Sequence, residues 1–255
     1  MRSPSTTPAI VLRSRSFGES DKIVSFLTQD YGKITGIAKG AKRSRKRFVN
    51  SLEPFSLVNL RFHDRPYSSL VFIQSCDWIR VFKQLTSNLE HIAYASYLVE
   101  ITDELTRERE ENRAPFDHLQ HGLIFIEEHG AFPLFLTVFE LGLLKLSGYE
   151  PMLERCRRCG ERPFGSSAKN GNGWRFSPAD GGIICAGCFA YRRETLPLSL
   201  EALSAMAMIQ KQDFVVQASL RLSPSALKET RSLLPRFIQF QIHKELKSIP
   251  FLEEL

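Results

Sequence analysis

Along the first part of the chain, apolar and polar residues alternate with the period of two that β-strands require. The alternation predicts strands at residues 9–15, 22–28, 33–39, 55–62 and 67–74, separated by turn-forming stretches. Five short strands over so short a length predict a small closed barrel, such as the OB-fold barrel. An SH3-like barrel has a similar pattern, and periodicity alone does not separate the two.

Beyond Trp78 the apolar spacing changes to the 3.6-residue period of amphipathic helices. Residues 133–147 are apolar on nearly every side, which predicts the buried central helix of a bundle. Ser223 and Pro224 predict the start of the last helix, because serine is a good N-cap and proline is tolerated at the first helical position. Pro235 is expected to kink or restart that helix. The predicted helices cover residues 89–105, 115–128, 133–147, 199–212 and 223–246.

A stretch without apolar periodicity separates the third of these helices from the fourth, and it is rich in turn-forming residues. We therefore predict an α+β multidomain fold in which an N-terminal five-stranded OB-fold barrel is followed by an α-helical domain with an insert. The expected boundaries are 1–80 for the barrel, 81–150 and 196–255 for the two parts of the helical domain, and 151–195 for the insert.

The insert contains four cysteines in the pattern C-x2-C-x25-C-x2-C, formed by Cys156, Cys159, Cys185 and Cys188. Two residues between thiols allow a tight turn to direct both sulfurs at one ion, and two such turns complete the tetrahedron that structural zinc prefers. We therefore predict a four-cysteine zinc finger with one structural Zn²⁺. Two disulfides or a redox CxxC are the alternatives. A disulfide pair is disfavoured because Cys76 would be left over and no secretory signal precedes the chain.

The negative charge of four thiolates around a divalent ion calls for nearby cations. Four arginines lie close enough in sequence to the first cysteine pair to offset that charge: Arg155, Arg157, Arg158 and Arg162. Arg157, Arg158 and Arg175 are equally candidates for contact with nucleic acid. Cys76, after an apolar strand, is expected to be a small core residue.

Composition is ordinary for a globular protein, with 43% hydrophobic and 24% charged residues, but the net charge of +6 is unevenly distributed. The basic segment, residues 39–47, contains no acid and six cations: Lys39, Lys42, Arg43, Arg45, Lys46 and Arg47. Without these six, the other 28 basic residues equal the 28 acidic ones. The segment is predicted to be a phosphate-binding arm on the barrel, with a solvated loop that binds nothing as the alternative.

Other residues of the barrel extend this candidate nucleic-acid surface. The cations Arg13, Arg15 and Lys33 are predicted DNA-binding residues, and Lys22 and Arg61 could widen the patch. Three aromatic residues have two interpretations, as stacking platforms for bases or as core residues of a small barrel: Phe17, Tyr31 and Phe48. Core packing is the more common role.

Several function classes are disfavoured by the sequence. The chain contains no phosphate-binding P-loop, GxSxG, HExxH or nucleotidyl-transfer KxDG motif, so we do not expect an enzyme. The polar N-terminus and the short apolar run at 133–146 indicate neither export nor a membrane span, which favours a cytoplasmic protein. Glu140, within that run, is expected either to pair with a cation at a packed junction or to mark a groove edge.

Six blocks of sequence, taken in order, point to one known family. They are Val11–Lys22, Gly36–Arg43, Ser51–Phe55, Ala93–Glu100, Phe139–Tyr149 and Phe176–Cys188. In these blocks the chain resembles bacterial RecO proteins over nearly its whole length. The resemblance implies an OB-fold, a helical domain and a zinc finger inserted in it.

The resemblance also implies a recombination mediator in DNA repair. Such a protein binds single- and double-stranded DNA, anneals complementary strands, engages the C-terminal tail of single-strand binding protein, and with RecR helps to load RecA. An RNA-binding zinc protein of the translation or transcription machinery is the alternative that the barrel, the basic segment and the cysteines leave open. A relative of DNA ligase is disfavoured by the missing nucleotidyl-transfer motif.

Overall fold

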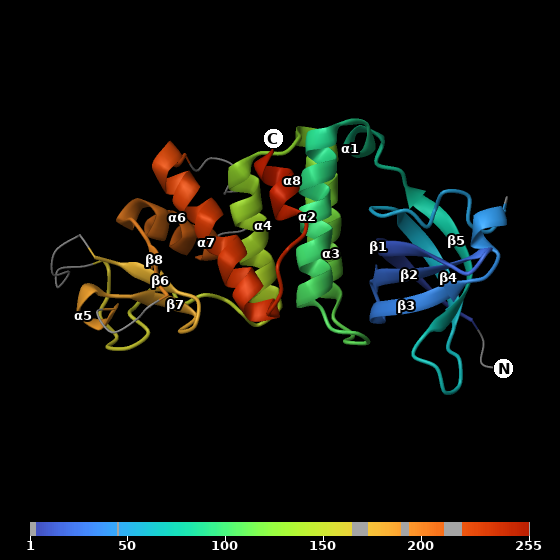
Figure 1. Ribbon diagram of the computed structural model, residues 1–255, viewed down its shortest axis with the longest axis horizontal. Helices are drawn as coiled ribbons and strands as arrows, with labels where there is room; N and C mark the ends of the chain where they lie inside the picture. Colours follow the sequence, from blue (N-terminus) through green and yellow to red (C-terminus); the bar gives the residue numbers. More distant parts are fainter. Residues whose placement is uncertain (1–3, 45, 165–172, 190–193, 212–220, 255) are drawn as a thin grey trace. The chain divides into compact units, whose positions relative to one another are not determined.

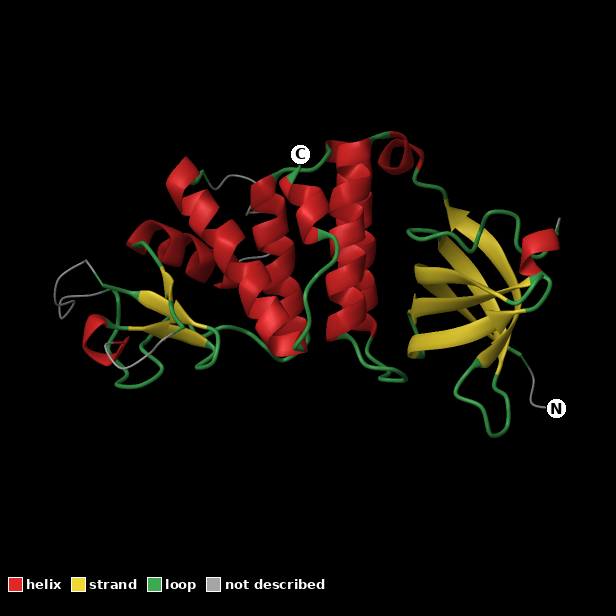
Figure 2. Ribbon diagram, viewed as in Figure 1, coloured by secondary structure: helices red, strands yellow, loops and turns green. Residues whose placement is uncertain are grey.

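A computed structural model describes residues 4–44, 46–164, 173–189, 194–211 and 221–254 (Figures 1 and 2). The chain groups into two compact units, one of residues 1–131 together with 247–255 and one of residues 132–246. Arg45, residues 165–172 of the predicted insert and Gln212 at the end of a predicted helix lie outside the described residues.

The first unit contains a closed five-stranded barrel, drawn in blue and teal in Figure 1. Its strands are β1 (Ser5–Phe17), β2 (Asp21–Thr28), β3 (Gly32–Ala38), β4 (Leu57–His63) and β5 (Val71–Arg80). They are joined in the order β1-β2-β3-β5-β4, with β4 closing onto β1 and a short parallel pairing between β3 and β5. This Greek-key closure is that of an OB-type barrel, as predicted, and it leaves no sheet edge open.

Strand alternation produces the barrel core. Side chains that alternate along each strand turn inward, and the large ones fill the interior, among them Phe26, Ile34 and Phe62. Residues 5–10 of β1 pair with β4 and residues 9–17 pair with β2 on the other edge, where a bulge between Val11 and Arg13 shifts the register. Cys76 is buried in this core, as expected.

Four helices complete the first unit: α1 (Lys83–Ser87), α2 (Leu89–Leu105), α3 (Arg113–His129) and α8 (Ile249–Glu253). Asn88 and Asn112 cap α2 and α3, each with a side-chain oxygen that accepts from backbone N–H groups of the first turn. The connection between α2 and α3 lies against β3. A Cβ atom at Gly32 would come within 2.0 Å of the Glu110 carbonyl oxygen, so this contact requires glycine.

The second unit packs three helices with a small three-stranded sheet. The helices are α4 (Pro133–Leu146), α6 (Leu200–Lys211) and α7 (Pro224–Ile242). The sheet has the order β7-β6-β8, formed by β6 (Arg175–Ser177), β7 (Gly182–Ile184) and β8 (Leu196–Pro197), and the short α5 (Ala186–Phe189) follows β7. Phe176 of β6 meets Phe237 of α7 edge to face at 5.1 Å, so the sheet shares an apolar core with the helix.

Helix α4 is buried on nearly all sides, as predicted. Its Glu140 is 0% exposed and forms an ion pair with Arg231 of α7, with 2.7 Å between Oε1 and the guanidinium. Of the two roles expected for Glu140, the structure shows the pair at a packed junction. Beside this pair the Thr137 and Thr230 hydroxyls lie 3.2 Å apart. Polar groups thus fix the α4–α7 register within an apolar core.

Several element boundaries differ from the predicted ones by a few residues; β1, for instance, begins at Ser5 instead of residue 9. Strand β5 begins at Val71 and continues to Arg80, beyond the predicted end at residue 74, because pairing with β4 extends to Leu57 opposite Arg80. Strand β4 begins at Leu57 instead of residue 55. Helix α7 continues through Pro235, so the predicted restart there is wrong; burial of Pro235 against the core holds the helix together where one backbone hydrogen bond is lost.

Candidate nucleic-acid interface and four-cysteine cluster

The basic segment connects β3 to β4 and begins with one turn of 3₁₀-helix, Ala41–Arg43. Backbone hydrogen bonds attach this turn to the β1–β2 loop: the Gly40 N–H donates to Asp21 Oδ1 at 2.8 Å and the Lys42 N–H donates to the Ser20 carbonyl at 2.9 Å. The hydrogen bond from Gly40 lowers the pKa of the exposed Asp21 carboxyl. The segment is therefore held on the barrel at a defined place.

Buried residues anchor the basic segment near both of its ends, whereas its cations are not buried. Ala41 and Phe48 lie in the barrel core. The described cations of the segment are all exposed: Lys39, Lys42, Arg43, Lys46 and Arg47. Within the described residues, none of them forms a salt bridge with a carboxylate. A tethered connection with unneutralised charge is a surface that attracts polyanions.

Two of the other predicted cations are already neutralised. Arg13 of β1 pairs with Asp103 of α2 and, at 2.6 Å, with Glu104. These two carboxylates outweigh partial burial and raise the Arg13 pKa. Lys33 of β3 donates to the Asp103 carboxylate at 3.1 Å and to its carbonyl oxygen at 2.5 Å. A DNA phosphate at Arg13 or Lys33 would have to displace these carboxylates.

The three candidate stacking residues, Phe17, Tyr31 and Phe48, differ in how far they are buried. Phe48 is buried in the core, and Tyr31 packs edge to face on Phe62 at 5.3 Å, so these two are packing residues. Phe17, at the end of β1, is half-exposed. Arg15, near that end, is exposed as well. Of the three aromatics, Phe17 alone presents its ring to solvent.

Tyr67 is an aromatic residue that the sequence reasoning missed. It lies in the β4–β5 loop, is fully exposed and has a φ of 58°, a conformation unfavourable for a bulky residue. Arg65 precedes it in the same loop and is exposed. In OB-folds the β1–β2 and β4–β5 loops commonly bind oligonucleotides. The turn signal of Asp64, Arg65 and Pro66 followed by an aromatic residue was visible in the sequence.

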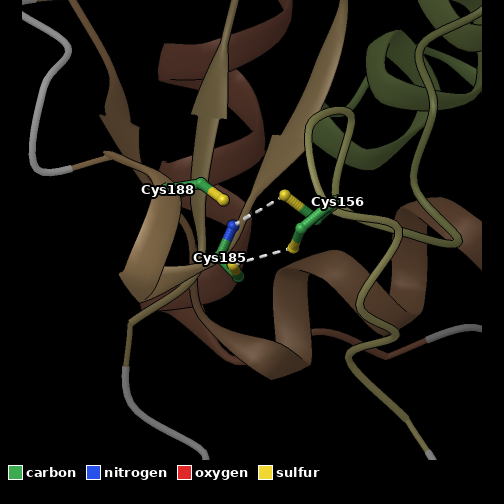
Figure 3. Close-up of side chains that lie close together, drawn as sticks. Cys156, Cys185 and Cys188 are labelled. Atoms are coloured by element: carbon green, nitrogen blue, oxygen red, sulfur yellow. Dashed lines mark hydrogen bonds between the residues drawn. The ribbon is translucent and has the colours of Figure 1, made fainter.

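The four cysteines of the insert come together in space, as Figure 3 shows for Cys156, Cys185 and Cys188. Their Sγ atoms, with that of Cys159, all lie within 4.8 Å of one another. Among the described residues, this is the only group of three or more potential ligands within such a distance. Within the same described residues, His91 of α2 and His118, His121 and His129 of α3 form no such group.

Local structure explains how the thiols converge. The first pair lies in a turn closed by a hydrogen bond from the Gly160 N–H to the Cys156 carbonyl at 3.0 Å. The second pair follows β7, and the Arg157 N–H donates to the Ile183 carbonyl at 2.9 Å, which joins the turn to the strand. Gly182 is required beside this contact, since a Cβ atom there would lie 2.4 Å from the Met152 carbonyl oxygen.

The electrostatics of the cluster favour a bound cation. Burial opposes ionisation of Cys156, but backbone N–H groups directed at its sulfur outweigh burial and lower its pKa to about 7. The pKa of Cys185 is raised, first by burial and then by hydrogen bonds to its neighbours. The Cys156 thiol thus ionises more easily than usual, whereas the Cys185 thiol ionises less easily. A bound metal cation stabilises all four cysteines as thiolates.

The dimensions of the cluster fit a tetrahedral ion. Zinc–sulfur bonds of about 2.3 Å place the sulfurs of a tetrahedron about 3.8 Å apart. The Cys159 and Cys185 sulfurs are 3.5 Å apart, far beyond a disulfide bond, and no described cysteine is disulfide-bonded. The four cysteines can therefore hold a metal ion. Two nearby arginines contact Asp180: Arg157 donates to its carbonyl at 2.9 Å, and Arg158 lies 3.6 Å from its carboxylate.

The fold and these residues define a class of protein in which an OB-type barrel precedes a helical region with a four-cysteine module. Two family models match the chain: "Recombination protein O N terminal" over residues 1–82 and "Recombination protein O C terminal" over residues 86–250. The chain belongs to the RecO family of DNA repair proteins. No helix in the described part of the chain is long and apolar enough to cross a membrane.

Curated relatives agree with the family models over nearly the full length. The chain is 34% identical to a "DNA repair protein RecO" from Syntrophus aciditrophicus over 256 aligned positions, covering 100% of this chain and 97% of the relative. A protein of the same name from Symbiobacterium thermophilum is 35% identical, with 96% and 95% covered. One from Myxococcus xanthus is 34% identical, with 97% and 96% covered.

Proposed function

We propose that this protein is a recombination mediator that binds single- and double-stranded DNA without reading its sequence. The observation that supports this most is the basic segment, whose described cations are exposed, free of carboxylate partners and tethered to the β1–β2 loop. Lysine and arginine contacts to phosphates supply binding energy that is independent of sequence. The exposed Arg15 extends this surface, whereas Arg13 and Lys33 contribute only when Asp103 and Glu104 release them.

Annealing of complementary strands follows from the same surface and needs no covalent step. Two DNA strands repel each other through their phosphates, and a protein that neutralises part of that charge lowers the barrier to their pairing. Because phosphate contacts do not involve the base edges, the bases remain available for each other. We accordingly propose a binding protein and not an enzyme.

For the cysteine cluster we propose one structural Zn²⁺ held by Cys156, Cys159, Cys185 and Cys188. Four protein ligands leave no open position for a substrate, so the ion supplies cross-linking and charge compensation. The module would then be held by the metal on one side and by the contact of Phe176 with Phe237 on the other. We propose that its role is to stabilise the second unit.

The proposed partners follow from membership of the family. They are RecR, the C-terminal tail of single-strand binding protein and, indirectly, RecA, and the proposed location is the cytoplasm at the nucleoid. The relatives' printed names support a role in DNA repair. A tail that is acidic and apolar would require a groove with apolar walls and basic rim residues, which we place in the helical part of the chain without assigning residues to it.

The experiment that tests this function measures annealing of two complementary oligonucleotides, each coated with single-strand binding protein. We expect the protein to accelerate annealing, and we expect RecR together with this protein to accelerate RecA loading. A matched RNA pair serves as the comparison substrate. Acceleration of RNA annealing with none on coated DNA would contradict a recombination mediator and would favour the RNA-binding alternative.

A further inference from the structure

Several large apolar side chains are exposed on β5, directly after β5 and shortly after the basic segment. They are Val49, Trp78, Ile79 and Val81, which we call the Trp78 patch. Trp78 is 40% exposed, and the other three side chains are each about half exposed. Single exposed apolar side chains are common on protein surfaces, so the case for a function rests on the contacts of Trp78.

Hydrogen bonds join the Trp78 patch to the basic segment. The Cys76 N–H donates to the Arg47 carbonyl at 3.2 Å, and the Ser51 hydroxyl donates to the Cys76 carbonyl at 2.8 Å. The Trp78 indole N–H donates to the Val49 carbonyl at 3.1 Å. The chain from Arg47 to Ser51 therefore runs beside β5, and Trp78 lies about two residues of extended chain, roughly 7 Å, from Arg47.

The orientation of the indole is fixed by this bond. Its one polar atom is satisfied by Val49, so what it offers a ligand is apolar ring surface. By contrast, Trp174, the other tryptophan of the chain, is 8% exposed. Phe48 cannot take this role, because it is buried and the Arg47 guanidinium covers its ring at 5.0 Å from the centroid.

We propose that Trp78 is a stacking platform for an unpaired nucleobase, while neighbouring phosphates of the same strand contact Lys46 and Arg47. This inference rests on the proposed DNA binding and adds the residue that distinguishes single strands from duplex. The bases of a duplex are stacked on each other and offer no free face to a side chain, whereas every unpaired base has one. A flat ring beside unneutralised cations matches an alternation of base and phosphate.

Charge complementarity selects DNA over an acidic, apolar peptide as the occupant of the Trp78 patch. The five described cations of the basic segment can match a run of phosphates that continues beyond the patch, whereas a short peptide end would cover only part of it. Stacking is sequence-tolerant because all four bases have a π-face. The platform therefore suits a protein that must bind any single strand.

The first test uses tryptophan fluorescence. Replacing Trp174 by Phe leaves Trp78 as the only tryptophan. We expect saturating oligo(dT) to quench the emission of this W174F protein, and a duplex hairpin of the same length to quench it far less. Binding of both DNAs is measured independently, from the anisotropy of a labelled oligonucleotide. Binding of oligo(dT) by anisotropy without any quenching would overturn the stacking proposal while leaving the proposed DNA binding intact.

The second test compares three substitutions by affinity for oligo(dT). Trp78→Ala is expected to weaken binding about tenfold, or about 1.4 kcal/mol, within the range known for base–aromatic stacking. Trp78→Phe keeps a ring and is expected to retain most of the affinity. Ile79→Ala removes a side chain of comparable exposure without a ring and is the matched control. Thermal unfolding of each variant shows whether the barrel is intact.

The salt dependence separates stacking from charge. Trp78→Ala removes no cation, so its plot of log K against log salt is expected to stay parallel to that of the unsubstituted protein. Equal losses for Ile79→Ala and Trp78→Ala would overturn the proposal in favour of general apolar contact. The proposal would also be overturned if Trp78→Ala lost affinity for a labelled acidic, apolar peptide and kept its affinity for oligo(dT). Failure of every variant and of the unsubstituted protein to bind DNA would instead refute the proposed function.

Discussion

Replacing Lys42, Arg43, Lys46 and Arg47 by Ala removes four of the five exposed cations that the structure describes in the basic segment. Each single-strand phosphate contact contributes about −0.7 to the slope of log K against log salt. If all five cations contact phosphates, the unsubstituted protein has a slope of about −3.5 from this segment, and the variant retains about −0.7. The segment's contribution to the slope thus falls to about a fifth.

This change of slope corresponds to a large difference in salt sensitivity. Between 50 and 200 mM salt, binding through five contacts weakens about 100-fold, whereas binding through one weakens about threefold. Anisotropy titrations of labelled oligo(dT) at four salt concentrations measure both slopes. The replaced side chains are exposed and form no described salt bridges, but Lys42 donates to the Gly18 carbonyl and Arg47 to the Lys39 carbonyl, so thermal unfolding of the variant is measured to show that the barrel is intact.

A matched variant tests whether position or net charge matters. Lys145, Arg221, Lys228 and Arg236 are exposed residues of the second unit, and their replacement by Ala changes the net charge equally. This control is expected to keep the steep slope, because scattered charges do not contact a strand bound at the barrel. The reasoning fails if the first variant keeps the slope of the unsubstituted protein, or if both variants lose it alike.

Three further substitutions probe the described contacts. Asp103→Asn removes the carboxylate that pairs with Lys33, whereas Arg13 keeps its ion pair with Glu104, so it is expected to steepen the salt slope of oligo(dT) binding by up to about 0.7, and an unchanged slope would show that Lys33 does not reach DNA. Cys156→Ser is expected to abolish stoichiometric zinc binding, measured by metal analysis, and to expose Trp174 to a fluorescence quencher. Binding of oligo(dT) is expected to persist. Retained zinc would contradict the four-cysteine site. Glu140→Ala removes the carboxylate that pairs with Arg231 in a packed junction. It is expected to lower the free energy of unfolding, measured in a denaturant titration, by about 3 kcal/mol. A change below about 1 kcal/mol would indicate that water solvates Arg231.

Much of the fold is encoded in local patterns. The alternation along β1 to β5 identifies all five strands, and the all-round apolar character of α4 identifies a buried helix. The type of barrel was open until the pairing was known, because strand order depends on which strands meet and not on the period within each. The parallel pairing of Gly36 and Ile37 with Val71 and Phe72 resolves it. Pro235 is a case in which a local pattern was misleading, since packing kept the helix continuous despite a helix-breaking residue.

The candidate nucleic-acid interface was likewise predictable from the sequence in part, and the rest required the structure. The excess charge of the basic segment is a property of composition, so it is visible in the chain alone. Whether a cation is free depends on its neighbours in space: Lys33 meets Asp103, a residue 70 positions away, and its charge is neutralised there. Trp78 was passed over for a related reason, because its exposure follows from the path of residues 47–51 beside β5.

The sequence by itself determined the four thiols and their spacing, the place where positive charge is concentrated, and the residues that must be buried. These depend on side-chain chemistry and on near neighbours along the chain. The tertiary structure alone decided that the thiols of two distant turns converge, that Asp103 and Glu104 pair with Arg13 and Lys33, and that the Trp78 ring lies beside the basic segment. The physical reason is that ion pairs, metal–ligand bonds and ring stacking form only between groups in close contact, and only chain folding brings residues far apart in sequence into such contact.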